Sequence, residues 1–297
     1  MKRKTKLFLL LLSVVFLCGC GKKEKYDLQV EYSALVFADV TGYYLGQQYY
    51  QGEEILLAGT KEGEVRLLRD GKREEILLRG MPESLLNIET RWWLDNQGNP
   101  YVLYRDKVFL LNQEGEVRLE AQADGVVTGI CESAAGEIVL KINAADKHRS
   151  GLTILDTKTG TMGKIIWLKD IAYCIAKGYE KDILIADAKG LYDYGLSDGS
   201  RQYYIEWRGT AYDPQSGAED IKFLSDNQIE LYAEKDMVVT LSKINPEESG
   251  KTVLTYKTTY VTGEIKELIV QFNKEDPDYY IVIEERQTNM PDLPYCF

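Results

Sequence analysis

The fold is decided by the stretch that spans residues 136–160, GEIVLKINAADKHRSGLTILDTKTG. A glycine turn leads into an apolar run that opens at Ile138, and a second apolar run over 152–155 ends at a turn that contains Gly160. Short apolar runs between glycine-containing turns favour antiparallel strands joined by hairpins, because glycine supplies the positive φ of tight turns. The stretch therefore predicts the second and third strands of one structural unit.

The same unit recurs along the chain at a nearly constant spacing. Four antiparallel strands that repeat every 40 to 45 residues or so are typical of β-propeller blades. The sequence therefore predicts a mainly β fold, an about five-bladed β-propeller over residues 28–245, followed by a short βαβ fragment. A β-sandwich is the alternative, but it would not account for the regular period. Equivalent apolar runs, separated by 46, 37, 45 and 46 residues, open at Ile55, Tyr101, Ile138, Ile183 and Ile229.

The fifth copy lacks a clear fourth strand, because residues 246–251 have the composition of a linker. Upstream of the first copy, Leu28, Val30 and Tyr32 alternate with polar residues and place apolar side chains on one face of a strand. We expect residues 28–32 to pair with residues 237–241. This pairing would close the ring and remove an exposed sheet edge.

The amino terminus has the pattern of an export signal. A basic head and an apolar run over residues 7–17 precede Leu17-Cys18-Gly19-Cys20, which resembles the bacterial lipobox. The resemblance implies that residues 1–20 comprise the signal peptide and lipobox, and that Cys20 receives diacylglycerol with acyl chains such as palmitate. Residues 21–27 would then form a polar tether. We expect a lipid-anchored protein on the extracytoplasmic face of the bacterial cell membrane.

The composition argues against several classes of function. The chain has 47 acidic and 36 basic residues and a net charge of −11, which becomes −15 once the four basic residues of the signal peptide are removed. Such acidity disfavours nucleic-acid binding, which requires clustered Lys and Arg. His148 is the single histidine, and no nucleophile elbow, Walker loop or dinucleotide fingerprint is present. We therefore predict no catalytic residue, no metal site, no cofactor and no enzymatic activity.

Cysteines and aromatic residues offer weaker signals. Cys131, Cys174 and Cys296 are an odd set without the spacing of a zinc site or a disulfide framework, so buried free thiols are favoured. A disulfide between Cys131 and Cys174 is the alternative, because these two occupy similar places in their repeats. Clustered aromatic side chains can also contact sugars or protein partners, although alternate members of such a run can simply face the core. The aromatic contact candidates are Trp92, Trp93, Tyr43 and Tyr44.

The period breaks after the linker. Residues 251–256 have the pattern of a strand, and Ile265, Leu268, Ile269 and Phe272 follow at helical spacing. Thr262 is a suitable N-cap for this helix, with Glu264 in the first turn. A second strand over residues 279–284 completes one βαβ unit.

This segment resembles the opening of the extracellular solute-binding proteins of bacterial ABC importers. The resemblance implies that residues 252–285 begin an α/β solute-binding domain and that the partner is an importer permease. It also implies that the loop after the first strand contacts the solute, which here corresponds to Tyr260, Val261, Thr262 and Gly263. The residues that carry it are 253–256 (VLTY), 264–268 (EIKEL), 272–278 (FNKEDPD) and 280–283 (YIVI).

The resemblance covers about 35 residues of 297, whereas a complete binding protein of that family has two lobes around a cleft. Residues 286–297 show no strand or helix pattern, and we expect a truncated domain that cannot bind solute alone. The predicted function is a solute-binding lipoprotein whose propeller is a recognition or spacer module. The alternative is a propeller-only lipoprotein that contacts a surface protein and carries the βαβ unit as a small structural cap.

Overall fold

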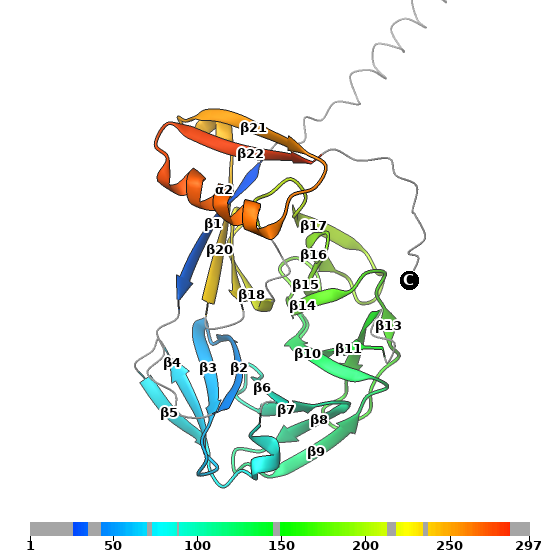
Figure 1. Cartoon of the computed structure of the whole chain (residues 1–297). Helices are drawn as coiled ribbons and strands as arrows, with labels where there is room; N and C mark the ends of the chain where they lie inside the picture. Colours follow the sequence, from blue (N-terminus) through cyan, green and yellow to red (C-terminus); the bar gives the residue numbers. More distant parts are fainter. Residues whose placement is uncertain are drawn as a thin grey trace, which may run out of the picture.

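The computed structural model describes residues 26–34, 43–69, 73–87, 89–144, 149–212, 218–233 and 237–285. Their strands form five antiparallel sheets of four strands each and one parallel sheet of two strands. Figure 1 shows the five larger sheets arranged around a ring. The predicted five-bladed propeller is therefore confirmed, and the sandwich alternative is excluded because the strands do not form two facing sheets.

The first two blades follow the order of the sequence from the innermost strand to the outermost. Blade 1 consists of β2 (Tyr43–Tyr50), β3 (Glu53–Gly59), β4 (Val65–Arg69) and β5 (Arg73–Leu78). A short 3-10 helix, Glu83–Leu85, connects it to the next blade. Blade 2 consists of β6 (Thr90–Leu94), β7 (Pro100–Tyr104), β8 (Lys107–Leu111) and β9 (Val117–Gln122).

The next two blades repeat this arrangement. In blade 3 the hairpin turn after β12 contains Gly160, whose φ of 73° places it in the left-handed region. The amide of Gly160 donates a 2.8 Å hydrogen bond to the carbonyl of Asp156, as the sequence pattern of the turn predicts. Blade 3 consists of β10 (Val126–Glu132), β11 (Ile138–Asn143), β12 (Ser150–Leu155) and β13 (Ile166–Trp167), and blade 4 of β14 (Ala172–Lys177), β15 (Ile183–Asp187), β16 (Gly190–Tyr194) and β17 (Arg201–Glu206).

Blade 5 is completed by the amino-terminal strand. Its inner strands are β18 (Ala218–Ser225), β19 (Gln228–Ala233) and β20 (Met237–Ile244), and β1 (Asp27–Ala34) pairs with β20 as the outermost strand. The predicted closure is thus confirmed, with a register in which Leu28 faces Lys243 and Tyr32 faces Val239. This register lies two residues further along β20 than expected.

Apolar clusters join four of the five neighbouring pairs of blades. They lie between blades 1 and 2, 2 and 3, 3 and 4, and 4 and 5. Between blades 5 and 1, the rings of Tyr49 and Tyr232 pack with their centroids 4.6 Å apart, and polar bonds cross the same contact. Tyr44 donates a hydrogen bond to Glu219, and the amide of Tyr49 donates one of 2.8 Å to Oδ2 of Asp220. The point where the ring closes is therefore held partly by polar side chains.

The C-terminal unit has the predicted βαβ order, with β21 (Thr252–Thr258), α2 (Gly263–Glu275) and β22 (Tyr279–Glu285). The two strands are parallel. Thr262 caps the helix, because its side chain accepts a hydrogen bond from the amide of Ile265, and Glu264 lies in the first turn. In the linker, residues Pro246–Glu248 form a short 3-10 helix. Among the described residues, no helix is long and apolar enough to span a membrane.

Candidate functional site

The C-terminal unit packs against the outer strands of blades 4 and 5 (Figure 1). Val261, Ile269 and Ile283 form an apolar cluster with Ala211, which belongs to the connection between these two blades. Beside this cluster, Tyr280 donates a 3.0 Å hydrogen bond to Asp27 of β1. The unit is therefore fixed to the propeller by both apolar and polar contacts. Two cavities described below lie between the unit and the propeller, one at each edge of the unit.

The larger cavity, which we call the carboxyl-edge cleft, has a volume of about 610 Å³. It lies where the carboxyl ends of β21 and β22 and the amino end of α2 meet blade 4. In α/β units, ligands bind at this edge, since the strands end there and the helix dipole favours negative charge. Its lining includes Lys189, Tyr203, Glu206, Arg208, Tyr260, Val261, Lys266 and Glu285.

Three cationic side chains line the carboxyl-edge cleft. Lys189 forms an ion pair with Asp170 at 2.8 Å, and Arg208 lies 3.9 Å from a carboxylate oxygen of Glu285. Lys266 is only 8% exposed, and its ammonium group donates a 3.1 Å hydrogen bond to the carbonyl of Tyr212. Within the described part of the chain this carbonyl is the only acceptor for that ammonium, which leaves donor capacity for an acidic ligand group.

Two exposed tyrosines border the same cleft from opposite parts of the fold. Tyr203 of β17 is 40% exposed, and Tyr260 of the loop between β21 and α2 is 74% exposed. Trp207 also lines the cleft; it is 3% exposed, and its indole Nε1 donates a 2.8 Å hydrogen bond to the carbonyl of Asp187. Aromatic rings with one exposed face are suited to stacking against flat or sugar-like rings.

The structure separates the four predicted solute-contact residues. Tyr260 and Val261 line the carboxyl-edge cleft, with Tyr260 exposed and Val261 buried in the apolar cluster below it. Thr262 caps α2 and Gly263 is the first residue of that helix. Cys20, the predicted lipidation site, and His148 lie outside the described residues.

The aromatic contact candidates lie in the inner strands of blades 1 and 2. Trp92 is 3% exposed, and its indole Nε1 donates a 2.9 Å hydrogen bond to the carbonyl of Leu85, so it belongs to the core. Trp93 packs against Tyr101 with ring centroids 5.6 Å apart. Tyr43 is partly buried against the cluster between blades 1 and 2, and Tyr44 bonds to Glu219 at the contact between blades 5 and 1. None of the four borders the carboxyl-edge cleft.

Cys131 and Cys174 are free thiols in this structure, and both are buried. Burial raises the pKa of each thiol, so both are neutral at ordinary pH. Lys141 is buried nearby, donates hydrogen bonds of 2.6 and 3.3 Å to the carbonyls of Tyr173 and Ala172, and has a pKa lowered by burial. Among the described residues, no group of acidic, histidine or cysteine side chains is arranged to hold a metal ion.

The sequence did not predict the residues that the propeller contributes to the cleft. Lys189 lies in the turn between β15 and β16, and Arg208 follows β17, so both occur in stretches that resemble ordinary turns. Gly209 is the one local sign of a close contact at this point. Its φ is +74°, and a Cβ there would lie 3.2 Å from the carbonyl oxygen of Ile283. This glycine lets the chain approach β22 closely, but the sequence does not indicate which segment it approaches.

No known protein family matches the sequence, and no curated protein matches it. Solved structures do match. A glutaminyl cyclase from Myxococcus xanthus is 13% identical, with 74% of this chain and 98% of that chain covered and a TM-score of 0.44. A gluconolactonase from Xanthomonas campestris is 10% identical, with 72% and 90% covered and a TM-score of 0.37. A luciferin-regenerating enzyme is 12% identical, with 72% and 87% covered and a TM-score of 0.43.

These comparisons correct one prediction. We expected no enzymatic activity because the sequence lacks known catalytic motifs, but the matched propellers include enzymes. The exclusion was wrong, because a propeller can assemble a site from loops of several blades, and such a site leaves no local motif in the sequence. The class of fold, a five-bladed β-propeller with a C-terminal βαβ unit, follows from the sheet topology of the described residues, and the comparisons assign no particular reaction to this chain.

Proposed function

We propose that the protein is an extracytoplasmic lipoprotein that binds a polar solute in the carboxyl-edge cleft. One observation carries the proposal. Tyr260 and Val261, from the loop that the resemblance assigns to solute contact, line a 610 Å³ cleft whose other wall is blade 4. In this arrangement the propeller takes the place of a second lobe, so the βαβ unit does not form the site alone.

The side chains of the cleft favour a solute that carries both an acidic group and a ring or several hydroxyl groups. Lys266, Arg208 and the amino end of α2 are suited to a carboxylate or phosphate. Tyr203 and Tyr260 are each suited to stack on a ring. The volume of about 610 Å³ is within the range of small-molecule sites in proteins.

Anchoring through Cys20 remains part of the proposal and is supported by the lipobox-like sequence. A lipid anchor would hold the cleft close to the membrane surface. There the protein could deliver solute to an importer permease or contact a surface protein. Labelling of cells with a radioactive fatty acid, for the wild type and for Cys20→Ser, tests the anchor, and equal labelling of both would exclude it.

The solute site can be tested by a thermal-shift screen of the mature chain. We expect acids with a ring, such as glucuronate or galacturonate, to raise the melting temperature more than their neutral counterparts glucose and galactose. The shift should disappear in Tyr260→Ala and persist in Tyr256→Ala. Tyr256 is a matched control, because it is a 39% exposed tyrosine of the same unit that does not border the cleft. Equal shifts in the two variants would exclude this cleft as the site.

A propeller-only lipoprotein that contacts a surface protein is the second candidate. It is favoured by the way the βαβ unit covers the outer strands of blades 4 and 5, with Ile269 and Ile283 buried against Ala211. In that case the unit would act as a cap. A screen in which no solute changes the melting temperature of the wild type would favour this candidate.

A further inference from the structure

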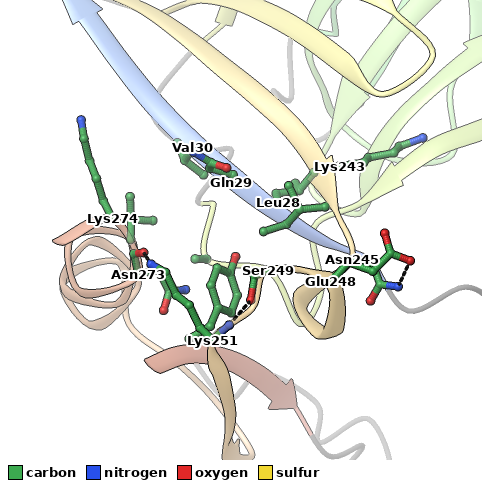
Figure 2. A pocket seen from close by; sticks show the side chains of 14 residues that line it. Leu28, Gln29, Val30, Lys243, Asn245, Glu248, Ser249, Lys251, Asn273 and Lys274 are labelled. Atoms are coloured by element: carbon green, nitrogen blue, oxygen red, sulfur yellow. Dashed lines mark hydrogen bonds between the residues drawn. The ribbon is translucent and has the colours of Figure 1, made fainter. Parts of the chain in front are cut away.

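A second groove, with a volume of about 550 Å³, lies at the opposite edge of the C-terminal unit (Figure 2). We call it the amino-edge groove, because it lies where β21 and β22 begin and α2 ends, against β1 and β20 of blade 5. Lys243, Lys251 and Lys274 line it. Among the described lining residues, Glu248 is the single acid, so these side chains carry a net charge of +2 in a chain of −11.

The three lysines border the groove without converging in it. Figure 2 shows Lys243 and Lys274 on opposite sides, with their side chains directed away from the centre. The ammonium group of Lys251 donates a 2.8 Å hydrogen bond to the carbonyl of Asn273. The carboxylate of Glu248 accepts a 3.0 Å hydrogen bond from the side chain of Asn245. Spread cations of this kind suit an extended anionic surface better than one small anion.

The length of chain between Cys20 and β1 limits how far this groove can be from a membrane anchor. Asp27 begins β1, and its carboxylate is held by Tyr280, which lines the groove. Cys20 precedes Asp27 by seven residues. An extended chain of that length spans at most about 25 Å. The tether also contains Lys22, Lys23 and Lys25.

We propose that the amino-edge groove rests on the anionic phospholipid headgroups of the membrane that holds the anchor. This inference depends on the anchoring part of the proposed function and is independent of the solute cleft. Each lysine near such a surface strengthens the association by roughly fivefold. Acidic residues more than about 10 Å away are largely screened, because the Debye length is about 10 Å at 0.1 M salt. The carboxyl-edge cleft would then face away from the bilayer or lie beside it.

Lysine footprinting on vesicles tests this orientation. The mature chain, with Cys296→Ser, is coupled through Cys20 to maleimide lipid, so that the result does not depend on natural lipidation. Cys131 and Cys174 are buried and should not react. A water-soluble amine reagent then labels the protein on vesicles of phosphatidylcholine alone and of phosphatidylcholine with phosphatidylglycerol, and mass spectrometry gives the labelling rate of each lysine.

We expect labelling of Lys243, Lys251 and Lys274 to be several-fold slower on the vesicles with phosphatidylglycerol, and the protection to vanish at high salt. Lys158, Lys164 and Lys169 serve as controls, because they are exposed on blade 3 and should react equally on both vesicles. Changing all three groove lysines to Gln should abolish the orientation in which the groove lies on the membrane. Changing the three control lysines to Gln should leave that orientation intact. Equal labelling of the groove lysines on both vesicles would overturn the proposal. Protection by dissolved inorganic phosphate alone would overturn it as well, because the groove would then be a site for the free ion.

Discussion

The hydroxyl of Tyr280 donates a 3.0 Å hydrogen bond to Oδ2 of Asp27, although the two residues are 253 positions apart in the sequence. Asp27 begins the strand that closes the propeller, and Tyr280 lies in the second strand of the C-terminal unit. Asp27 is 4% exposed, and burial raises the pKa of its carboxyl from 3.8 to about 6. One carboxyl group therefore lies at both the ring closure and the attachment of the unit.

The first prediction concerns pH. Because the pKa of Asp27 is higher in the folded protein than in the unfolded chain, its contribution to stability is present below about pH 4 and is lost as the pH rises through about 6. Asp27→Asn removes this titration. The free energy of unfolding of the variant, relative to the wild type, should therefore rise between pH 4.5 and 7.5 by about 1 to 3 kcal/mol.

Urea denaturation at the two pH values measures this difference. Glu31→Gln is the control, because Glu31 is an exposed carboxyl residue on the same strand. A difference between Asp27→Asn and the wild type that does not change with pH would contradict the assignment.

A second prediction tests the ring closure. Leu28 is 2% exposed in the apolar cluster between blades 4 and 5, so Leu28→Ala should lower the free energy of unfolding by about 2 to 5 kcal/mol. Gln29→Ala, at an exposed position of the same strand, should change it by about 0.5 kcal/mol or less. Similar values for both variants in urea denaturation would mean that β1 is not part of the core.

A third prediction concerns the close approach of Gly209 to β22. Gly209 and Gly250 have φ values of +74° and +75°, but only at Gly209 does an added Cβ meet another atom, the carbonyl oxygen of Ile283 at 3.2 Å. Alanine should cost about 1 kcal/mol at Gly250 from backbone strain alone, and more at Gly209. Limited proteolysis of the C-terminal unit should accelerate in Gly209→Ala and change less in Gly250→Ala. The reverse order would show that this contact does not hold the unit.

A fourth prediction addresses the polar contact between blades 5 and 1. Tyr44 donates a hydrogen bond to Glu219, and the guanidinium of Arg91 lies 5.6 Å from the centroid of its ring. Tyr44→Phe keeps the ring and removes the donor, so it should cost about 1 to 2 kcal/mol in thermal or urea unfolding. Tyr43→Phe on the same strand should cost less. Equal costs would argue against a role for this bond in closing the ring.

The repeating part of the fold could be predicted from the sequence, because strand alternation and glycine turns are local signals. The turn at Gly160 and the alternation at Leu28 and Val30 were sufficient to predict the hairpin and the closure. The pairing of β1 with β20 is shifted by two residues from the predicted one, because β20 continues through Ser242 and Lys243 to Ile244. Polar residues at the end of a strand do not show the alternation from which its length was estimated.

The cleft could be predicted only in part. Tyr260 and Val261 were identified from a resemblance that covers the βαβ unit alone. Lys189, Tyr203 and Arg208 come from blade 4, and they meet the unit because it packs on that part of the ring. Tertiary packing of this kind depends on shape and on contacts such as Ala211 with Ile283, for which a single sequence contains no local pattern.

The central claim is that blade 4 and the C-terminal unit bind one solute between them, and titration calorimetry tests it most directly. The strongest acidic ligand of the thermal-shift screen is titrated into the wild type, into Tyr260→Ala and Arg208→Gln from the two walls of the cleft, and into the control Tyr256→Ala. We predict a loss of affinity of about tenfold or more for each wall variant, about 1.4 kcal/mol, and no loss for the control. Unchanged affinity in Arg208→Gln, or no binding of any acidic solute to the wild type, would contradict the claim.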